Sequence, residues 1–173
     1  YTDYNVFITA RTNTVTASST FYENVTGGRI NAHMPWSDNI LYWDAGAASA
    51  SQRLQVAWGG SVATNYIWGL TASTTATASG VRQEIYRNGR RLAFDNNMTA
   101  FTGNGSVFNL GSAGGGSYFN GDIDEVVMYR GNLTASQLQK IQSYLAIKWG
   151  ISLDQTATTS YYASDWNGAT GTV

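Results

Sequence analysis

The stretch from residue 121 to residue 150 decides the fold class, and it reads GDIDEVVMYRGNLTASQLQKIQSYLAIKWG. Its first part, residues 121–129, carries apolar side chains at both odd and even positions. This pattern predicts a strand that is buried on both faces, in a sandwich or under a helix. Strict alternation along such a strand places Ile123, Val127 and Tyr129 on one face and Val126 and Met128 on the other.

The second half of this stretch predicts the helix itself. Thr134 and Gln137 have the spacing of a capping box, in which each side chain bonds the other residue's backbone N–H. Gly150 supplies the residue that commonly ends a helix. Between these ends, apolar residues recur at the spacing of one helix face, at Leu138, Ile141 and Leu145. We therefore expect one helix over residues 134–149 that covers part of a sheet.

Short strands joined by glycine and asparagine turns are predicted for the rest of the chain. The clearest case is residues 83–94, where two β-type runs flank Asn88-Gly89, a pair that suits the type I′ turn of a hairpin. Residues 38–44 alternate, which places Asp38, Tyr42 and Asp44 on one face. Because β-branched and aromatic residues dominate these runs, the chain is predicted to be all-β apart from the one helix.

Composition excludes several classes of function. The chain has 173 residues, no cysteine, one histidine and a formal net charge of −1. Thiolate and multi-histidine metal sites are excluded, and the lack of a basic surplus argues against a nucleic-acid partner. No apolar run approaches the ~20 residues that a membrane-spanning helix needs. The chain begins at Tyr1 without a methionine, so we expect it to be part of a longer multidomain chain.

The acidic residues at 122–125 are the best candidates for catalysis. Retaining glycosidases place two carboxylates ~5 Å apart, and a strand motif Glu-x-Asp-x-x-Glu can supply them. The matching positions here are Asp122, Asp124 and Val127, so the last carboxylate is missing. No Gly-x-Ser-x-Gly elbow and no phosphate-binding glycine loop is present. The sequence therefore predicts that the chain is not an enzyme.

Calcium is the one metal that the sequence leaves open. Ca²⁺ takes six to eight oxygen ligands, many of them backbone carbonyls, so a site can be built from distant loops. No compact ligand motif is present, and no cofactor is predicted. The aspartates that stand beside predicted loops are Asp38, Asp44, Asp95, Asp122 and Asp124.

The best candidates for ligand binding surround Pro35, the only proline of the chain. Its fixed backbone forces a turn that presents Trp36, and His33, Asp38 and Asp44 lie close by in sequence. A sugar ring stacked on Trp36 and hydrogen-bonded to Asp38 would make a shallow lectin site. We expect these four residues to bind a ligand through loops at one end of the domain. The alternative is that this turn is a purely structural corner.

Four segments together resemble one known family. Residues 121–129 with the helix after them, and the hairpin segment Ile85-Tyr86-Arg87-Asn88-Gly89, resemble parts of laminin G-like, concanavalin A-like jelly rolls. Residues 144–151 and 162–165 resemble the ending of modules in large bacterial surface adhesins. The resemblance covers about residues 5–165.

The resemblance implies a fold and a function. The fold would be an all-β, two-sheet antiparallel jelly-roll sandwich with one short C-terminal helix over residues 1–155, and residues 156–173 would be a linker or the start of a following module. The function would be non-catalytic binding or adhesion, with a glycan or a cell-surface protein as the partner and the bacterial cell surface as the location. The alternatives are a glycoside hydrolase or polysaccharide lyase on the same fold, and a spacer domain that binds nothing.

Overall fold

The computed structural model describes residues 1–47 and 49–155. The described chain forms ten strands, one short 3₁₀ helix and one α-helix. The strands are β1 (Asp3–Thr12), β2 (Phe21–Val25), β3 (Gly28–His33), β4 (Ile40–Ala47), β5 (Leu54–Ala57), β6 (Tyr66–Ser73), β7 (Gln83–Arg87), β8 (Arg90–Asp95), β9 (Asn109–Leu110) and β10 (Gly121–Tyr129). The 3₁₀ helix η1 spans Ala50–Gln52, and the helix α1 spans Ala135–Trp149.

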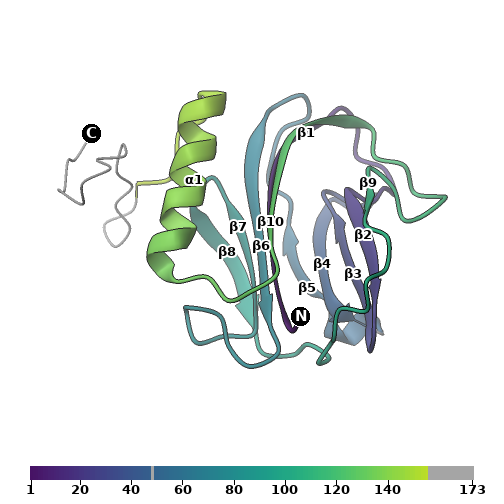
Figure 1. Ribbon diagram of the computed structural model, residues 1–173. Helices are drawn as coiled ribbons and strands as arrows, with labels where there is room; N and C mark the ends of the chain where they lie inside the picture. The colour runs from purple at the N-terminus through teal and green to yellow at the C-terminus, as the bar shows by residue number, and fades with distance from the viewer. Residues whose placement is uncertain (48, 156–173) are drawn as a thin grey trace.

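The strands form two five-stranded sheets, and every strand pairing within them is antiparallel. The first sheet has the order β10-β1-β6-β7-β8 and the second has the order β5-β4-β3-β2-β9. Figure 1 shows three layers, with α1 on one side of the first sheet and the second sheet on the other. The predicted all-β, two-sheet jelly-roll sandwich with one helix is confirmed.

The main hydrophobic core lies between the two sheets. Alternate residues of β1, such as Tyr4 and Val6, are fully buried there with Phe21 and Trp43 from the second sheet. The indole Nε1 of Trp43 donates to the backbone oxygen of Thr71 at 3.1 Å, so this large ring is both buried and hydrogen-bonded. One face of β4 therefore packs in the main core, and its other face points away from that core.

A second, smaller core lies between the first sheet and α1. Phe7 and Ile67 point away from the main core and pack against apolar residues of the helix, among which Leu145 is fully buried. The predicted helix ends are confirmed, because the Thr134 side chain accepts from the Gln137 N–H and Gly150 adopts a left-handed φ of 65°. The helix therefore completes the fold rather than projecting from it.

The predicted hairpin at residues 83–94 is confirmed. Strands β7 and β8 are joined by Asn88 and Gly89, whose φ values of 46° and 84° are both positive, as a type I′ turn requires. The side-chain oxygen of Asn88 also accepts from the Ile67 N–H at 2.8 Å, which ties the turn to β6. This turn forms one wall of a pocket described below.

The predicted faces of β10 are wrong in one respect. Val126 and Val127 lie on opposite faces, as predicted, with Val126 in the main core and Val127 under α1, but Ile123 lies with Val126 instead of with Val127. The pairing of β10 with β1 skips Asp124, which forms a β-bulge. One extra residue reverses the alternation on its N-terminal side, and a hydrophobic pattern read with strict period two cannot show it.

Residues 156–173, which were predicted to be a linker or the start of another module, lie outside the described residues. The domain boundary at residue 155 therefore stays a prediction. Within the described residues, no helix combines the length and the apolar character that crossing a membrane requires.

Candidate ligand-binding site

The outer face of the second sheet carries polar and aromatic side chains. Residues on this face alternate along β3 and β4 with the residues of the main core, and they form cross-strand pairs: Asn31 with Asp44, His33 with Tyr42, and Tyr42 with Gln55. A connected group at one part of this face contains all four residues that the sequence predicted for ligand binding. We call it the polar cluster, and it consists of His33, Trp36, Asp38, Tyr42, Asp44 and Arg53.

Trp36 stands in a tight turn between β3 and β4. Its backbone N–H donates to the Ile40 oxygen at 2.8 Å, and its oxygen accepts from the Asn39 N–H at 3.0 Å. Asn39 has a φ of 68°, a left-handed conformation that asparagine tolerates. The indole is partly exposed and packs edge-to-face on the His33 ring, with 4.4 Å between ring centroids. The protein therefore holds the ring in position while part of it stays accessible.

Asp38 is exposed in the same turn, and both of its carboxylate oxygens are oriented by the protein. Oδ1 accepts from the Ile40 N–H at 3.0 Å and Oδ2 accepts from the Tyr42 hydroxyl at 2.6 Å. The bond from Tyr42 is the main reason that the pKa of Asp38 lies below its usual value. Each oxygen keeps a further lone pair, so Asp38 presents an ionised, fixed acceptor close to Trp36.

Tyr42 contacts Asp38, Arg53 and His33, and it therefore connects the turn to the strand residues of the polar cluster. The guanidinium of Arg53 lies 4.3 Å from the centre of the Tyr42 ring, and the His33 ring lies 6.2 Å away in an edge-on arrangement. A cation over an aromatic ring is attracted to its electron-rich face. Tyr42 is only half-buried, so its ring and the Arg53 guanidinium form a partly accessible surface.

Asp44 is fully buried at the base of the polar cluster. It accepts from the Nε of Arg29 at 2.7 Å and from the Nε of Arg53 at 2.6 Å. With a third bond from the Arg53 Nη2 at 3.2 Å, these charge-assisted bonds offset the cost of burying this carboxylate. Asp44 therefore cannot touch a ligand directly, and its role in the cluster is to orient two arginine side chains.

His33 is also buried, with 6% of its surface exposed. Its Nδ1 lies 2.8 Å from the Ser18 backbone oxygen and must carry the proton, which leaves Nε2 to accept from the Asn31 amide at 3.1 Å. Burial is the main cause that lowers the pKa of His33, so the imidazole is neutral and fully hydrogen-bonded. It supports Trp36 and Tyr42 from below.

The structure brings the four predicted residues together, but it divides them into two pairs. Trp36 and Asp38 are accessible in the turn, whereas His33 and Asp44 lie within strands on the sheet face. Sequence reasoning missed Arg53 as a member, because only the pairing of β4 with β5 brings it beside Asp44. Tyr42 had a signal, since alternation already placed it on the same face as Asp38 and Asp44.

The acidic residues of β10 do not form a comparable site. Asp122 pairs with Arg11, and the carboxylate of Glu125 accepts from the Trp149 indole and the Tyr144 hydroxyl of α1. Partial burial raises the pKa of Glu125, but these bonds and Lys148 outweigh it, so that the pKa lies below its usual value. Glu125 therefore fastens the helix to the sheet.

In the described part of the chain, no three histidine, aspartate or glutamate side chains lie close enough together to hold a metal ion. Two of the calcium candidates already have cationic partners: Asp44 binds two arginines, and Asp122 binds one.

Comparison with known proteins agrees with this architecture. A model of the concanavalin A-like lectin/glucanases superfamily matches residues 4–139. The chain belongs to this superfamily. A second family model, described as a domain of unknown function (DUF8202), matches residues 137–172, so the two matches meet within α1. No curated protein matches the chain significantly.

Solved structures of the same fold come from several kinds of protein. Domain 4 of AbnA, an extracellular GH43 arabinanase from Geobacillus stearothermophilus, solved with arabinotriose, matches with a TM-score of 0.52 and 19% identity over 82% of this chain and 66% of that one. A pentraxin from Limulus polyphemus matches with a TM-score of 0.57 and 14% identity, over 82% of this chain and 70% of that one. A sialidase from Trypanosoma rangeli matches with a TM-score of 0.55 and 14% identity over 88% of this chain, and the match spans only 24% of the sialidase.

Proposed function

We propose that this chain is a non-catalytic carbohydrate-binding module whose glycan ligand lies over the polar cluster. The observation that carries the proposal is the pairing of Trp36 with Asp38 in one fixed, accessible turn. A flat indole suits the C–H face of a sugar ring, and a carboxylate accepts hydrogen bonds from sugar hydroxyls. Few polar groups of fixed orientation beside an aromatic surface are typical of small-ligand sites.

The cluster is ordered before any ligand arrives. Asp38 is held by Tyr42 and the Ile40 N–H, and Trp36 rests on His33. Binding would therefore cost little side-chain entropy. Arg53 donates through Nε and Nη2 to Asp44, which leaves its Nη1 for a ligand hydroxyl. In this proposal Trp36, Asp38 and Arg53 contact the glycan, while His33 and Asp44 position them.

The carboxylates of the cluster support binding rather than hydrolysis. A glycosidase needs one carboxyl group that stays protonated, with a raised pKa, and a second carboxylate at a set distance. The pKa of Asp38 is lowered, and Asp44 is buried beneath two arginines. A carbohydrate-active enzyme on the same fold is the alternative, and release of reducing sugar would reveal it.

We further propose that the module acts in a longer extracellular chain, in adhesion to glycans at a bacterial surface. The arabinanase domain of the same fold is part of an extracellular protein, and it was solved with a bound arabino-oligosaccharide. Trp36 is only partly exposed and Asp38 stands exposed in a turn, so we expect a single site of this kind to bind weakly. Several modules or copies acting together would supply the avidity that adhesion needs.

A glycan array that includes arabinotriose tests the proposal with the full chain. Trp36→Ala and Asp38→Asn are expected to lose binding to whichever glycans the parent binds. Tyr118→Ala and Asp122→Asn are matched controls, since Tyr118 is 70% exposed and Asp122 is exposed on β10, and both are expected to bind like the parent. Unchanged binding by folded Trp36→Ala and Asp38→Asn variants would contradict the proposal, and an array with no binding would favour a spacer domain.

A further inference from the structure

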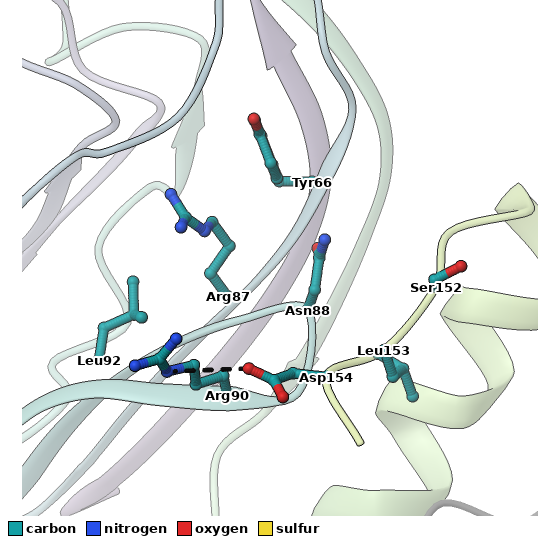
Figure 2. Close-up of a pocket in the computed structure, with 8 residues that line it drawn as sticks. All are labelled: Tyr66, Arg87, Asn88, Arg90, Leu92, Ser152, Leu153 and Asp154. Atoms are coloured by element: carbon teal, nitrogen blue, oxygen red, sulfur yellow. Dashed lines mark ion pairs between the residues drawn. The ribbon is translucent and has the colours of Figure 1, made fainter. Parts of the chain in front are cut away.

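A pocket with a volume of about 250 Å³ lies at the turn of the β7–β8 hairpin, apart from the polar cluster. Its walls come from the hairpin, from Tyr66 at the start of β6 and from residues 152–154, which follow α1. Figure 2 shows the guanidinium groups of Arg87 and Arg90 and the carboxylate of Asp154 around the same space. Typical pockets for drug-sized ligands are about 300–1,000 Å³, so this one suits a small ligand.

Arg87 is the central feature of this pocket. It is partly buried, and it is held by one bond from Nη1 to the Trp58 backbone oxygen at 2.6 Å. Its guanidinium also lies 5.2 Å from the centre of the Tyr66 ring and 5.8 Å from that of Trp68. The side chain is therefore fixed in place, in contrast to an ordinary surface arginine.

Arg87 has no carboxylate within ion-pair distance among the described residues, whereas six of the described arginines do. Its Nη1 is occupied, but no described residue accepts from its Nε or Nη2. That edge of a guanidinium is one that binds a carboxylate through two parallel hydrogen bonds. Arg87 thus presents a fixed cationic edge for which none of the described residues supplies an anion.

Arg90 and Asp154 are the other charged side chains of the pocket, and with Arg87 they determine its net charge. Arg90 and Asp154 form a loose pair, with 3.7 Å between Nε and Oδ2 and with the Arg90 side chain 66% exposed. Such an exposed pair contributes little energy, so Arg90 is free to turn toward a ligand. Asp154 itself is anchored, because its backbone N–H donates to the Asn88 oxygen at 2.8 Å. Two arginines and one aspartate leave a single net positive charge.

We propose that this pocket is a second binding site, which takes a small ligand with one carboxylate and holds that carboxylate on Arg87. The single net charge matches a monoanion, and Asp154 would repel a dianion such as phosphate. Tyr66 and Leu92 supply an apolar wall for the body of the ligand. The source of the carboxylate is a uronate-type sugar or a free small carboxylic acid. The site is independent of the glycan site proposed above.

Chemical-shift titration of the isotope-labelled full chain tests this, with D-glucuronate, D-glucose, acetate and inorganic phosphate as probes. D-glucuronate is expected to give saturable shifts at the amides of Asn88, Leu92 and Asp154, and D-glucose to give none there. Acetate is expected to shift the same amides; tighter binding of glucuronate identifies a sugar acid, and equal binding identifies a free carboxylic acid. Stronger binding of phosphate than of both carboxylates would overturn the proposal.

Variants separate this site from general electrostatic attraction. Arg87→Gln is expected to weaken glucuronate binding about 10-fold or more, because it removes both charge-assisted bonds. Arg87→Lys keeps the charge but not the paired donors, and its affinity for glucuronate is expected to lie between that of Arg87→Gln and that of the parent. Asp154→Asn is expected to tighten binding about two-fold to five-fold. Arg11→Gln removes an equal charge elsewhere and serves as the control. Equal losses in Arg87→Gln and Arg11→Gln would refute the site, and this result would leave neutral-glycan binding at the polar cluster unaffected.

Discussion

Replacing Leu145 by alanine is expected to destabilise the fold by about 3 kcal/mol. The Leu145 side chain is fully buried between α1 and the first sheet, in the cluster that includes Phe7 and Ile67. Each buried carbon group lost costs about 0.8 kcal/mol, so the three removed cost roughly 2.4 kcal/mol before any cavity is counted. Because a helix on the outside of a sheet can settle into the gap, we expect a value in the lower half of the roughly 2–5 kcal/mol range of such substitutions.

Urea unfolding followed by tryptophan fluorescence and by far-ultraviolet circular dichroism measures this loss. Ile147→Ala is the matched control, because Ile147 is on the same helix and is 64% exposed, and it is expected to cost less than about 0.5 kcal/mol. The two probes should give one transition if α1 belongs to the same cooperative unit as the sheets. A cost for Leu145→Ala no larger than that for Ile147→Ala, or a separate transition of the helix, would refute the reasoning and the domain boundary at residue 155.

Two further predictions concern pH and metal ions. The unfolded chain takes up a proton on His33 near pH 6.5, whereas burial lowers the pKa of the folded His33, so the free energy of unfolding is expected to fall as the pH drops from about 7 to about 5.5. His33→Gln should flatten this part of the profile, and an unchanged slope in that variant would assign the effect to other groups. The melting temperature is expected to be the same with and without a chelator, and a loss of more than about 10 °C with the chelator would reveal a structural metal.

Local signals in the sequence predicted the local parts of the fold. The type I′ turn requires two consecutive positive φ values, which few other turns need, and Asn88-Gly89 is a pair that adopts them. The Thr134–Gln137 capping box sets the start of the helix through contacts within one helical turn. The alternation at residues 38–44 correctly separated Tyr42 and Asp44 from Trp43. In each case the interacting residues are close in the chain, so the pattern itself contains the geometry.

Features that depend on which strands pair, and in what register, could not be predicted. The bulge at Asp124 exists because β10 pairs with β1 across more than a hundred residues of sequence, and it moved Ile123 to the other face. Arg53 joins Asp44 only through the pairing of β4 with β5. The pocket at Arg87 exists only because the Trp58 backbone holds the guanidinium and the segment after α1 lies beside it. Charged residues brought together by topology carry no local signature.

The position of the Trp36 indole resonance during a glycan titration tests the central proposal most directly. The indole N–H of Trp43 is bonded to the Thr71 oxygen and that of Trp149 to Glu125, so these two serve as internal references. With a glycan identified on the array, the Trp36 indole signal is expected to shift in a saturable way while the Trp43 and Trp149 signals stay in place. Saturable binding that leaves the Trp36 signal unmoved would contradict a glycan site at the polar cluster.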